Sequence, residues 1–150
     1  MHISSSHTLF CFYFLYCECE QQATWGFLRY SLPMLMNLGI GGISFSGADV
    51  GGFAGNPDVE LQTRWYQAAA LTPFFRAHSS NDTARREPWL YGEPHVSNIR
   101  DAIRVRYTHM PYVVTQFRHA NATGQAPLRP LLQVRARPCI RSATIERVMS

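Results

Sequence analysis

The sequence predicts an α/β fold in which helices alternate with short buried strands. In several segments, apolar residues recur every three or four positions, which is typical of amphipathic helices. Between these segments lie two short apolar runs, residues 43–45 and 73–75, whose β-branched and aromatic content indicates buried strands. A helix, strand, helix, strand, helix order favours a parallel sheet.

The first helix is expected over residues 23–38. Pro33 lies inside this stretch and predicts a kink or a division into two pieces. Gly39 is a natural helix stop. We expect Trp25 in this helix, and Trp89 further along the chain, to belong to the core. The apolar side chains of the helix share one face at helical spacing: Trp25, Leu28, Leu32, Leu35 and Met36.

The next two helices carry recognisable start signals. Pro57 and Asp58 open the second helix, with Asp58 near the N-cap, and the apolar pattern continues to about residue 71. Ser97 is expected to cap the third helix, which covers about residues 99–109.

The last predicted helix begins or bends at Pro111, reaches about residue 122 and ends at Gly124. Residues 126–132 then look extended. Two strands cannot close a barrel, and a (β/α)₈ barrel needs roughly 250 residues, whereas this chain has 150. The pattern therefore leaves two alternatives, a small open α/β sheet or a piece of a larger fold.

Composition excludes some classes of partner and structure. The chain is 46% hydrophobic and 16% charged, which is typical of a globular protein. Its net charge is +4, but the arginines are scattered and form no basic stripe interleaved with aromatic residues, so we expect no nucleic-acid partner. The apolar run at residues 8–17 is too short to cross a bilayer, so no membrane span is expected. A secretory signal there is not favoured, because residues 1–7 contain no lysine or arginine.

The cysteine and histidine spacings predict neither a metal site nor a cofactor. Cys17 and Cys19 stand too close for a zinc knuckle, and no second pair of the CxxC type exists. His78, His95 and the later histidines lack ligand spacing on any one element. The glycine-rich residues 47–55 lack the GK[ST] ending of a phosphate-binding loop.

Polar residues follow both predicted strands, as they do on the catalytic face of a (β/α) barrel. Asp49 lies in a glycine-rich turn after the first strand, and Arg76 and His78 follow the second. From the residues alone, Asp49 is better interpreted as a turn residue that caps backbone amides than as a ligand contact. Arg76 is either a ligand contact or an ion-pair partner, and Phe53 either contacts a ligand or closes the core. The residues Arg85, Arg86 and Glu87 are expected to form a solvated or ion-paired loop.

The order of motifs resembles glycoside hydrolase family 31, the α-glucosidases, and is most similar to the branch that trims glucose from N-glycans in the endoplasmic reticulum. The similarity covers about residues 23–132 and rests on these segments: FSGADVGGF (45–53), RWYQ (64–67), PFFRAH (73–78), REPWL (86–90), IRDAIRVRY (99–107), MPY (110–112) and RPL (129–131).

The resemblance implies that the chain is an incomplete part of a (β/α)₈ TIM barrel, containing about strands 7 and 8 with their flanking helices. Residues 23–125 would belong to the catalytic barrel and residues 126–132 to the start of a β-sandwich. Residues 1–22 and 133–150 do not match. It also implies an endoplasmic-reticulum lumenal location and a regulatory subunit as partner. The glucose in the cleavage subsite would be held by groups that match Asp49, Phe53, Arg76 and His78.

The two carboxylates of a retaining glycosidase are not both represented. The WxDMNE-type segment that carries the family's nucleophile is absent from the 150 residues. The family's acid/base is the Asp of a Trp-x-Gly-Asp-Asn motif, and Glu20 occupies that position. Cys17, Cys19 and Gln21 stand where Trp, Gly and Asn are expected. The extra methylene of Glu20 would displace the carboxyl group by about an ångström, which can cost around a hundredfold in rate.

The resemblance therefore predicts a fragment of a retaining α-glucosidase that hydrolyses α-linked glucose, and predicts that the 150 residues are inactive alone. Two alternatives stay open. The chain binds carbohydrate without cleaving it, or it is a truncated product that does not fold, because an unclosed sheet exposes strand edges. The unrelated flanks favour a truncated or mis-spliced coding sequence over a genuine small protein.

Overall fold

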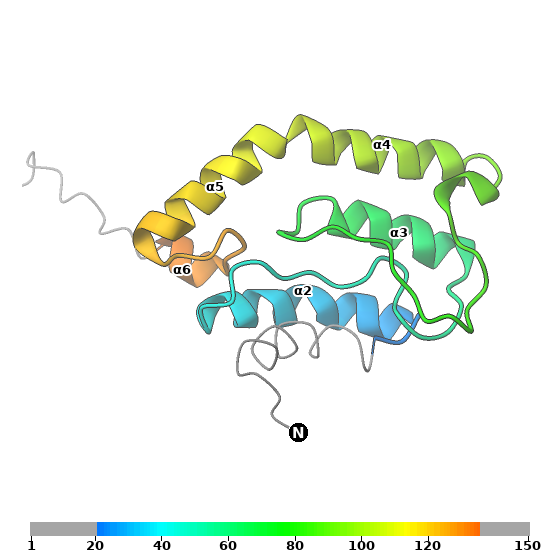
Figure 1. Cartoon of the computed structure of the whole chain (residues 1–150), viewed down its shortest axis with the longest axis horizontal. Helices are drawn as coiled ribbons and strands as arrows, with labels where there is room; N and C mark the ends of the chain where they lie inside the picture. Colours follow the sequence, from blue (N-terminus) through cyan, green and yellow to red (C-terminus); the bar gives the residue numbers. More distant parts are fainter. Residues whose placement is uncertain (1–20, 136–150) are drawn as a thin grey trace, which may run out of the picture.

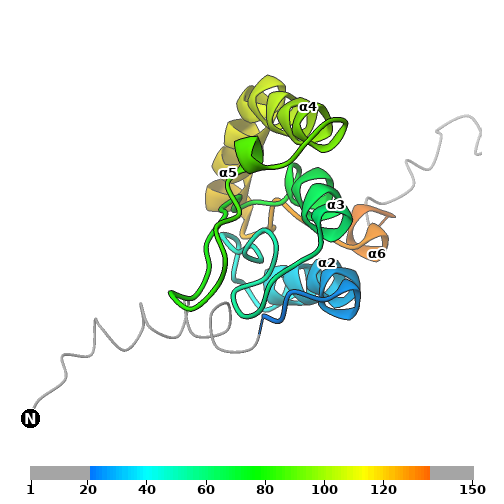
Figure 2. The same ribbon diagram turned by 90° about the vertical axis from the view of Figure 1, so that its right-hand side faces the viewer.

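The structure is a computed structural model that describes residues 21–135, and its regular elements are helical. α3 lies between α2 and α4 in both views, and α5 continues from α4 along the outer side (Figures 1 and 2). The elements in chain order are α2 (Trp25–Ile40), α3 (Val59–Ala69), η1 (Pro88–Leu90), α4 (His95–Thr108), α5 (Met110–Thr123) and α6 (Leu131–Arg135).

α2 forms where the apolar periodicity predicts a helix. Thr24 caps it by accepting a 3.2 Å hydrogen bond from the amide of Phe27. The expected division at Pro33 is wrong, because α2 continues through Pro33 as one element. A proline removes one hydrogen bond from a helix, and the buried Leu35 in the next turn keeps the C-terminal half of α2 packed.

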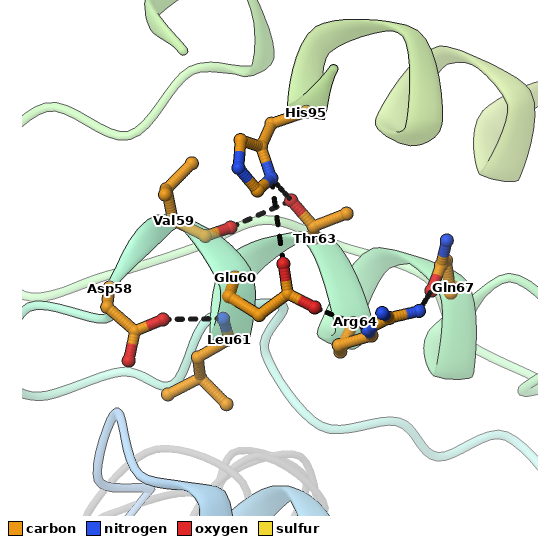
Figure 3. A network of polar contacts seen from close by, with 8 residues as sticks. All are labelled: Asp58, Val59, Glu60, Leu61, Thr63, Arg64, Gln67 and His95. Carbon is orange, nitrogen blue, oxygen red and sulfur yellow. Dashed lines mark hydrogen bonds and ion pairs between the residues drawn. The ribbon is translucent and has the colours of Figure 1, made fainter. Parts of the chain in front are cut away.

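α3 begins where the sequence predicts. Asp58 is the N-cap, and its Oδ1 accepts a 2.8 Å hydrogen bond from the amide of Leu61 (Figure 3). The buried face of α3 supplies Leu61 and Trp65 to the core. The remaining buried members of this core come from the loop before α3, from α3 itself and from α4: Ala48, Val50, Tyr66, Ala69, Ile99 and Ala102.

α4 begins earlier than expected. Its first residue is His95, whose Nδ1 lies 3.0 Å from Thr63 Oγ1 and 3.9 Å from Glu60 Oε2 on α3 (Figure 3). The prediction that Ser97 caps this helix is wrong, because Ser97 lies inside the first turn and its amide donates to Glu93 Oε2. At this helix start the amides of His95 and Val96 donate to the carbonyl of Gly92.

The end of α5 is set by glycine, as predicted. Gly124 adopts a left-handed conformation with φ of 75°, and its amide bonds to the carbonyl of Ala120. The expected extended segment at residues 126–132 is interrupted, because α6 begins at Leu131.

The strands expected at residues 43–45 and 73–75 are not formed in the part of the chain that the structure describes. The two segments nevertheless lie side by side. Phe74 N donates to Ser46 O over 3.1 Å, and Val50 N donates to Arg76 O over 2.8 Å. Both segments therefore run in the same direction, and the two bonds fit one register of a parallel pair, but no strand is assigned to either segment.

Two tryptophans expected in the core are exposed instead. Trp25 is 49% exposed and Trp89 is 71% exposed. Residues 21–135 therefore cover about half of Trp25 and less of Trp89, and neither belongs to the buried core.

Candidate functional site

Gly47 allows the two parallel segments to approach closely. A methyl group at this position would lie 2.1 Å from the carbonyl oxygen of Phe74 and 3.0 Å from its Cβ. No other residue type fits beside that carbonyl without moving the backbone. The close approach places Asp49, two residues later, opposite Arg76 on the neighbouring segment.

Asp49 and Arg76 form an ion pair. Arg76 Nε and Nη2 both lie 2.8 Å from Asp49 Oδ1. The Asp49 side chain is 1% exposed and that of Arg76 is 24% exposed, so water screens the pair weakly. The amide of Asp49 donates to Gln21 Oε1 over 2.7 Å, and the Arg76 guanidinium lies 5.2 Å from the ring centroid of Phe74. Backbone and side chain of Asp49 are both held in place.

Phe53 and His78 form a second pair between the same two segments. Their ring centroids are 5.4 Å apart with an interplanar angle of 40°. The main chain supports this contact from both sides, since Phe53 N donates to Gln21 O and Ser80 N donates to Phe53 O. The four residues predicted to contact the sugar are therefore brought together on two adjacent segments. The fifth candidate, Glu20, lies outside the described residues.

Two residues that support the site are not assigned a role by the sequence. Gln21 is 1% exposed and accepts hydrogen bonds from the amides of Asp49, Phe53 and Ala54. Arg86 is 8% exposed and donates to glycine carbonyls in the loop between Asp49 and Phe53. No local pattern in the sequence identifies either contact, because each joins residues about 30 positions apart.

The loop that contains Arg86 was expected to be solvated or ion-paired. This holds for Arg85, which is paired with Glu87 at 2.8 Å and has an exposed side chain. It is wrong for Arg86, which is buried. The hydrogen bond and charge of Arg85 lower the pKa of Glu87, so Glu87 stays ionised in the pair.

A groove of about 530 Å³ adjoins the site on the side of His78. Its walls include Tyr66, Arg85 and Trp89, together with the hydroxyl side chains of residues 79, 80 and 83. Burial raises the pKa of Tyr66 to about 12, and the charge of Tyr91 acts in the same direction. Tyr66 is therefore a neutral hydroxyl at physiological pH.

Within residues 21–135, no group of three or more histidine, cysteine, aspartate or glutamate side chains is arranged to hold a metal ion. The helices of that region also include none that is long and apolar enough to span a bilayer.

The sequence profile described as "Glycosyl hydrolases family 31 TIM-barrel domain" matches residues 19–116. The chain belongs to glycoside hydrolase family 31. Its matched region begins one residue before Glu20 and contains all four residues of the two pairs, Asp49, Arg76, Phe53 and His78.

Individual family 31 proteins are similar to the chain over the same region. A protein named "Probable glucan 1,3-alpha-glucosidase" from Arabidopsis thaliana is 56% identical over 112 residues, which are 75% of this chain and 12% of that protein. Two crystal structures match with a TM-score of 0.74 and 49% identity, over 76% of this chain and 12% of theirs. One is the Glc1Man2-bound glucosidase II alpha subunit. The other is an ER glucosidase II heterodimer of the catalytic subunit and the binding domain of the regulatory subunit.

The chain therefore spans about an eighth of the length of these family 31 relatives. The family match assigns the matched region to a TIM-barrel domain. The described residues are helical and extended without assigned strands, so the assignment to strands 7 and 8 stays a prediction.

Proposed function

We propose that this chain contributes the glucose-binding side of a retaining α-glucosidase site that acts on α-linked glucose. The observation that carries the proposal is the ion pair of Asp49 and Arg76 beside the ring contact of Phe53 and His78. These side chains supply hydrogen-bond acceptors, hydrogen-bond donors and an apolar face on adjacent segments of a family 31 chain. A pyranose ring has hydroxyl groups and an apolar face that match all three.

Each side chain has a chemical role in this proposal. Arg76, the more exposed partner of the ion pair, donates to sugar hydroxyls, and the buried carboxylate of Asp49 keeps the guanidinium oriented. The ring of His78 donates one hydrogen bond to a sugar hydroxyl. Phe53 covers an apolar face of the ring. None of the four is a nucleophile, so their contribution is binding and orientation of the bond to be cleaved.

Cleavage needs two further carboxyl groups, because retaining glycosidases use one as nucleophile and one as acid/base. The WxDMNE-type segment is absent from the 150 residues, and Glu20 is the residue at the acid/base position. We therefore expect no hydrolysis by the chain alone. Its proposed activity is that of the whole barrel to which such a segment belongs.

A chimera tests the contribution of the chain to catalysis. The matched segment of the Arabidopsis relative is replaced by the corresponding residues of this chain, and hydrolysis of nitrophenyl α-glucoside is measured. We expect activity, a loss of about a hundredfold or more with Asp49→Asn in the chimera, and little effect of Asp101→Asn at an exposed position. An active chimera that is indifferent to Asp49→Asn would refute the assignment.

Binding without cleavage is the second candidate function, favoured because both side-chain pairs are present while the nucleophile segment is not. The experiment is a titration of the 150-residue chain with deoxynojirimycin, followed through the NMR signals of Phe53 and His78. We expect shifts confined to the site at millimolar ligand. The absence of any shift at that concentration would eliminate this candidate.

We further propose an endoplasmic-reticulum lumenal location and a regulatory subunit as partner for the whole protein. The support is similarity to a heterodimeric ER glucosidase II. Co-purification of the chimera with the binding domain of a glucosidase II regulatory subunit is the expected result. Loss of binding under conditions in which the unmodified relative binds would show that the residues of this chain do not support such a partner.

A further inference from the structure

Three glycine carbonyls of the loop between Asp49 and α3 point at one side chain. Arg86 Nη1 donates to Gly52 O over 2.7 Å and to Gly51 O over 3.3 Å, and its Nη2 donates to Gly55 O over 2.7 Å. All three glycines have a positive φ, between 81° and 94°. This backbone conformation, which glycine adopts without strain, turns the carbonyls to the same side of the loop.

Arg86 is buried against this loop, with 8% of its surface exposed. Burial lowers the pKa of Arg86, while the nearby Tyr91 and Asp49 oppose that shift. A guanidinium stays charged even when its pKa is lowered from so high a value. The loop is therefore arranged around a permanent positive charge. The buried carboxylate of Asp49 interacts electrostatically with this charge.

The far side of the loop is filled by α3. A methyl group at Gly51 would lie 2.0 Å from Gln62 Oε1, and Gln62 is fully buried. A methyl group at Gly52 would lie 2.7 Å from the amide nitrogen of Ala23. The loop is thus packed closely against Gln62 at Gly51 and against Ala23 at Gly52. On the side that faces Arg86, the guanidinium determines where the loop carbonyls lie.

The position of this loop decides the position of the site. It joins Asp49, paired with Arg76, to Phe53, in ring contact with His78. A loop released from Arg86 keeps Asp49 through the ion pair of its side chain. Phe53 is held by main-chain bonds, to Gln21 O and from Ser80 N, so the position of its ring depends on the backbone of the loop. Phe53 is therefore the site residue most sensitive to Arg86.

We propose that Arg86 is a positioning residue, which sets the glycine-rich loop so that Phe53 meets His78 at the sugar subsite. The sugar subsite itself rests on the proposed function, whereas the positioning role does not need a ligand to be tested. Arg86 does not contact substrate in this proposal and acts through the loop.

The test uses the full 150-residue chain as wild type, Arg86→Gln, Arg86→Lys and Arg85→Gln. The exposed, ion-paired Arg85 is the matched control one residue away. Residue-resolved amide exchange and the NOE between the rings of Phe53 and His78 are measured without ligand. Loss of a charge-assisted hydrogen bond corresponds to roughly a tenfold to hundredfold change in an opening equilibrium.

With Arg86→Gln, we expect exchange of the amides of Gly52, Phe53 and Ala54 to accelerate by about tenfold or more relative to those of α4, and the NOE to weaken. Arg86→Lys restores part of both, and Arg85→Gln changes neither. A uniform acceleration over α3, α4 and the loop means a general stabilising role and overturns the proposal, as does an unchanged loop. If Arg86→Gln does not fold, Arg86→Lys decides the question by the same readouts.

Deoxynojirimycin separates this proposal from the function on which it rests. Weaker binding by Arg86→Gln, with partial rescue by Arg86→Lys, connects the loop to the subsite. A wild-type chain that binds no deoxynojirimycin, yet shows the expected exchange pattern, refutes the sugar subsite and leaves the positioning role of Arg86 supported.

Discussion

Replacing Gly47 with alanine should separate the two segments that bring Asp49 and Arg76 together. The new methyl group would lie 2.1 Å from the Phe74 carbonyl oxygen, where ordinary contact begins at 3.4 Å. The obstacle is backbone, so no side-chain rotation relieves it. The segments must move apart by more than an ångström, which is enough to break a hydrogen bond.

The size of the effect follows from the contacts that this movement stretches. Two main-chain bonds are lost, from Phe74 N to Ser46 O and from Val50 N to Arg76 O, at about 1 kcal/mol each. The ion pair of Asp49 with Arg76 is strained as well. Together these give a loss of about 3 kcal/mol in the free energy of unfolding, within the range measured for overpacked interiors.

Urea denaturation followed by far-UV circular dichroism measures this loss. Gly92→Ala is the matched control, since a methyl group at Gly92 meets no atom within 4 Å, and we expect it to change stability by less than about 0.5 kcal/mol. Deoxynojirimycin binding, where present, should weaken in Gly47→Ala alone. Equal stability of the two variants would show that the segments are not in contact at Gly47, and the geometry of the site would have to be abandoned.

Two further predictions concern groups outside the site. Arg106→Met should lower the free energy of unfolding by about 3–5 kcal/mol, because the buried guanidinium donates to the carbonyls of Thr72 and Pro73. The exposed Arg104→Met is its control, and equal urea midpoints for the two variants would contradict the prediction. Burial raises the pKa of Tyr66 from 10.0 to about 12, so the folded chain keeps a proton that the unfolded chain loses. The contribution of Tyr66 protonation to the free energy of unfolding is complete below about pH 10. It falls by about 2–3 kcal/mol as the pH rises to about 12. In Tyr66→Phe the free energy of unfolding should lack this loss between about pH 10 and about pH 12. Identical curves of unfolding free energy against pH for variant and wild type would contradict the prediction.

Local sequence signals predicted those helix ends that depend on residues close in the sequence. Asp58 caps α3 and Gly124 ends α5 as the sequence indicates, since both bonds lie within a few residues of the cap. The prediction for Ser97 failed because the side chain that accepts from the first turn of α4 is that of Glu93, which bonds to the amide of Ser97. The contact of His95 with Thr63, 32 residues away, is of a kind that a local pattern does not contain.

The same distinction explains the site. Asp49 and Arg76, which follow the two apolar runs, meet as an ion pair because the parallel segments that carry them lie side by side. Their role in sugar binding stays a prediction. Gln21 and Arg86 were not assigned supporting roles, because a buried amide and a buried guanidinium are recognised only by the carbonyls and amides around them. The strands themselves were over-predicted, since apolar content indicates burial but a ladder needs a regularly paired neighbour.

Gly39 also has a topological consequence. Near the end of α2 it lies so close to Ala126 and Leu128 that a methyl group would stand 2.9 Å from both. The chain leaves α2, passes through three further α-helices and returns to touch its own starting helix. This contact joins residues about three quarters of the described sequence apart. Contacts of that span form late because the entropy of ordering the intervening chain must be overcome first. During synthesis, the contact between α2 and residues 126–128 can therefore form only after the segment that follows α5 has been made.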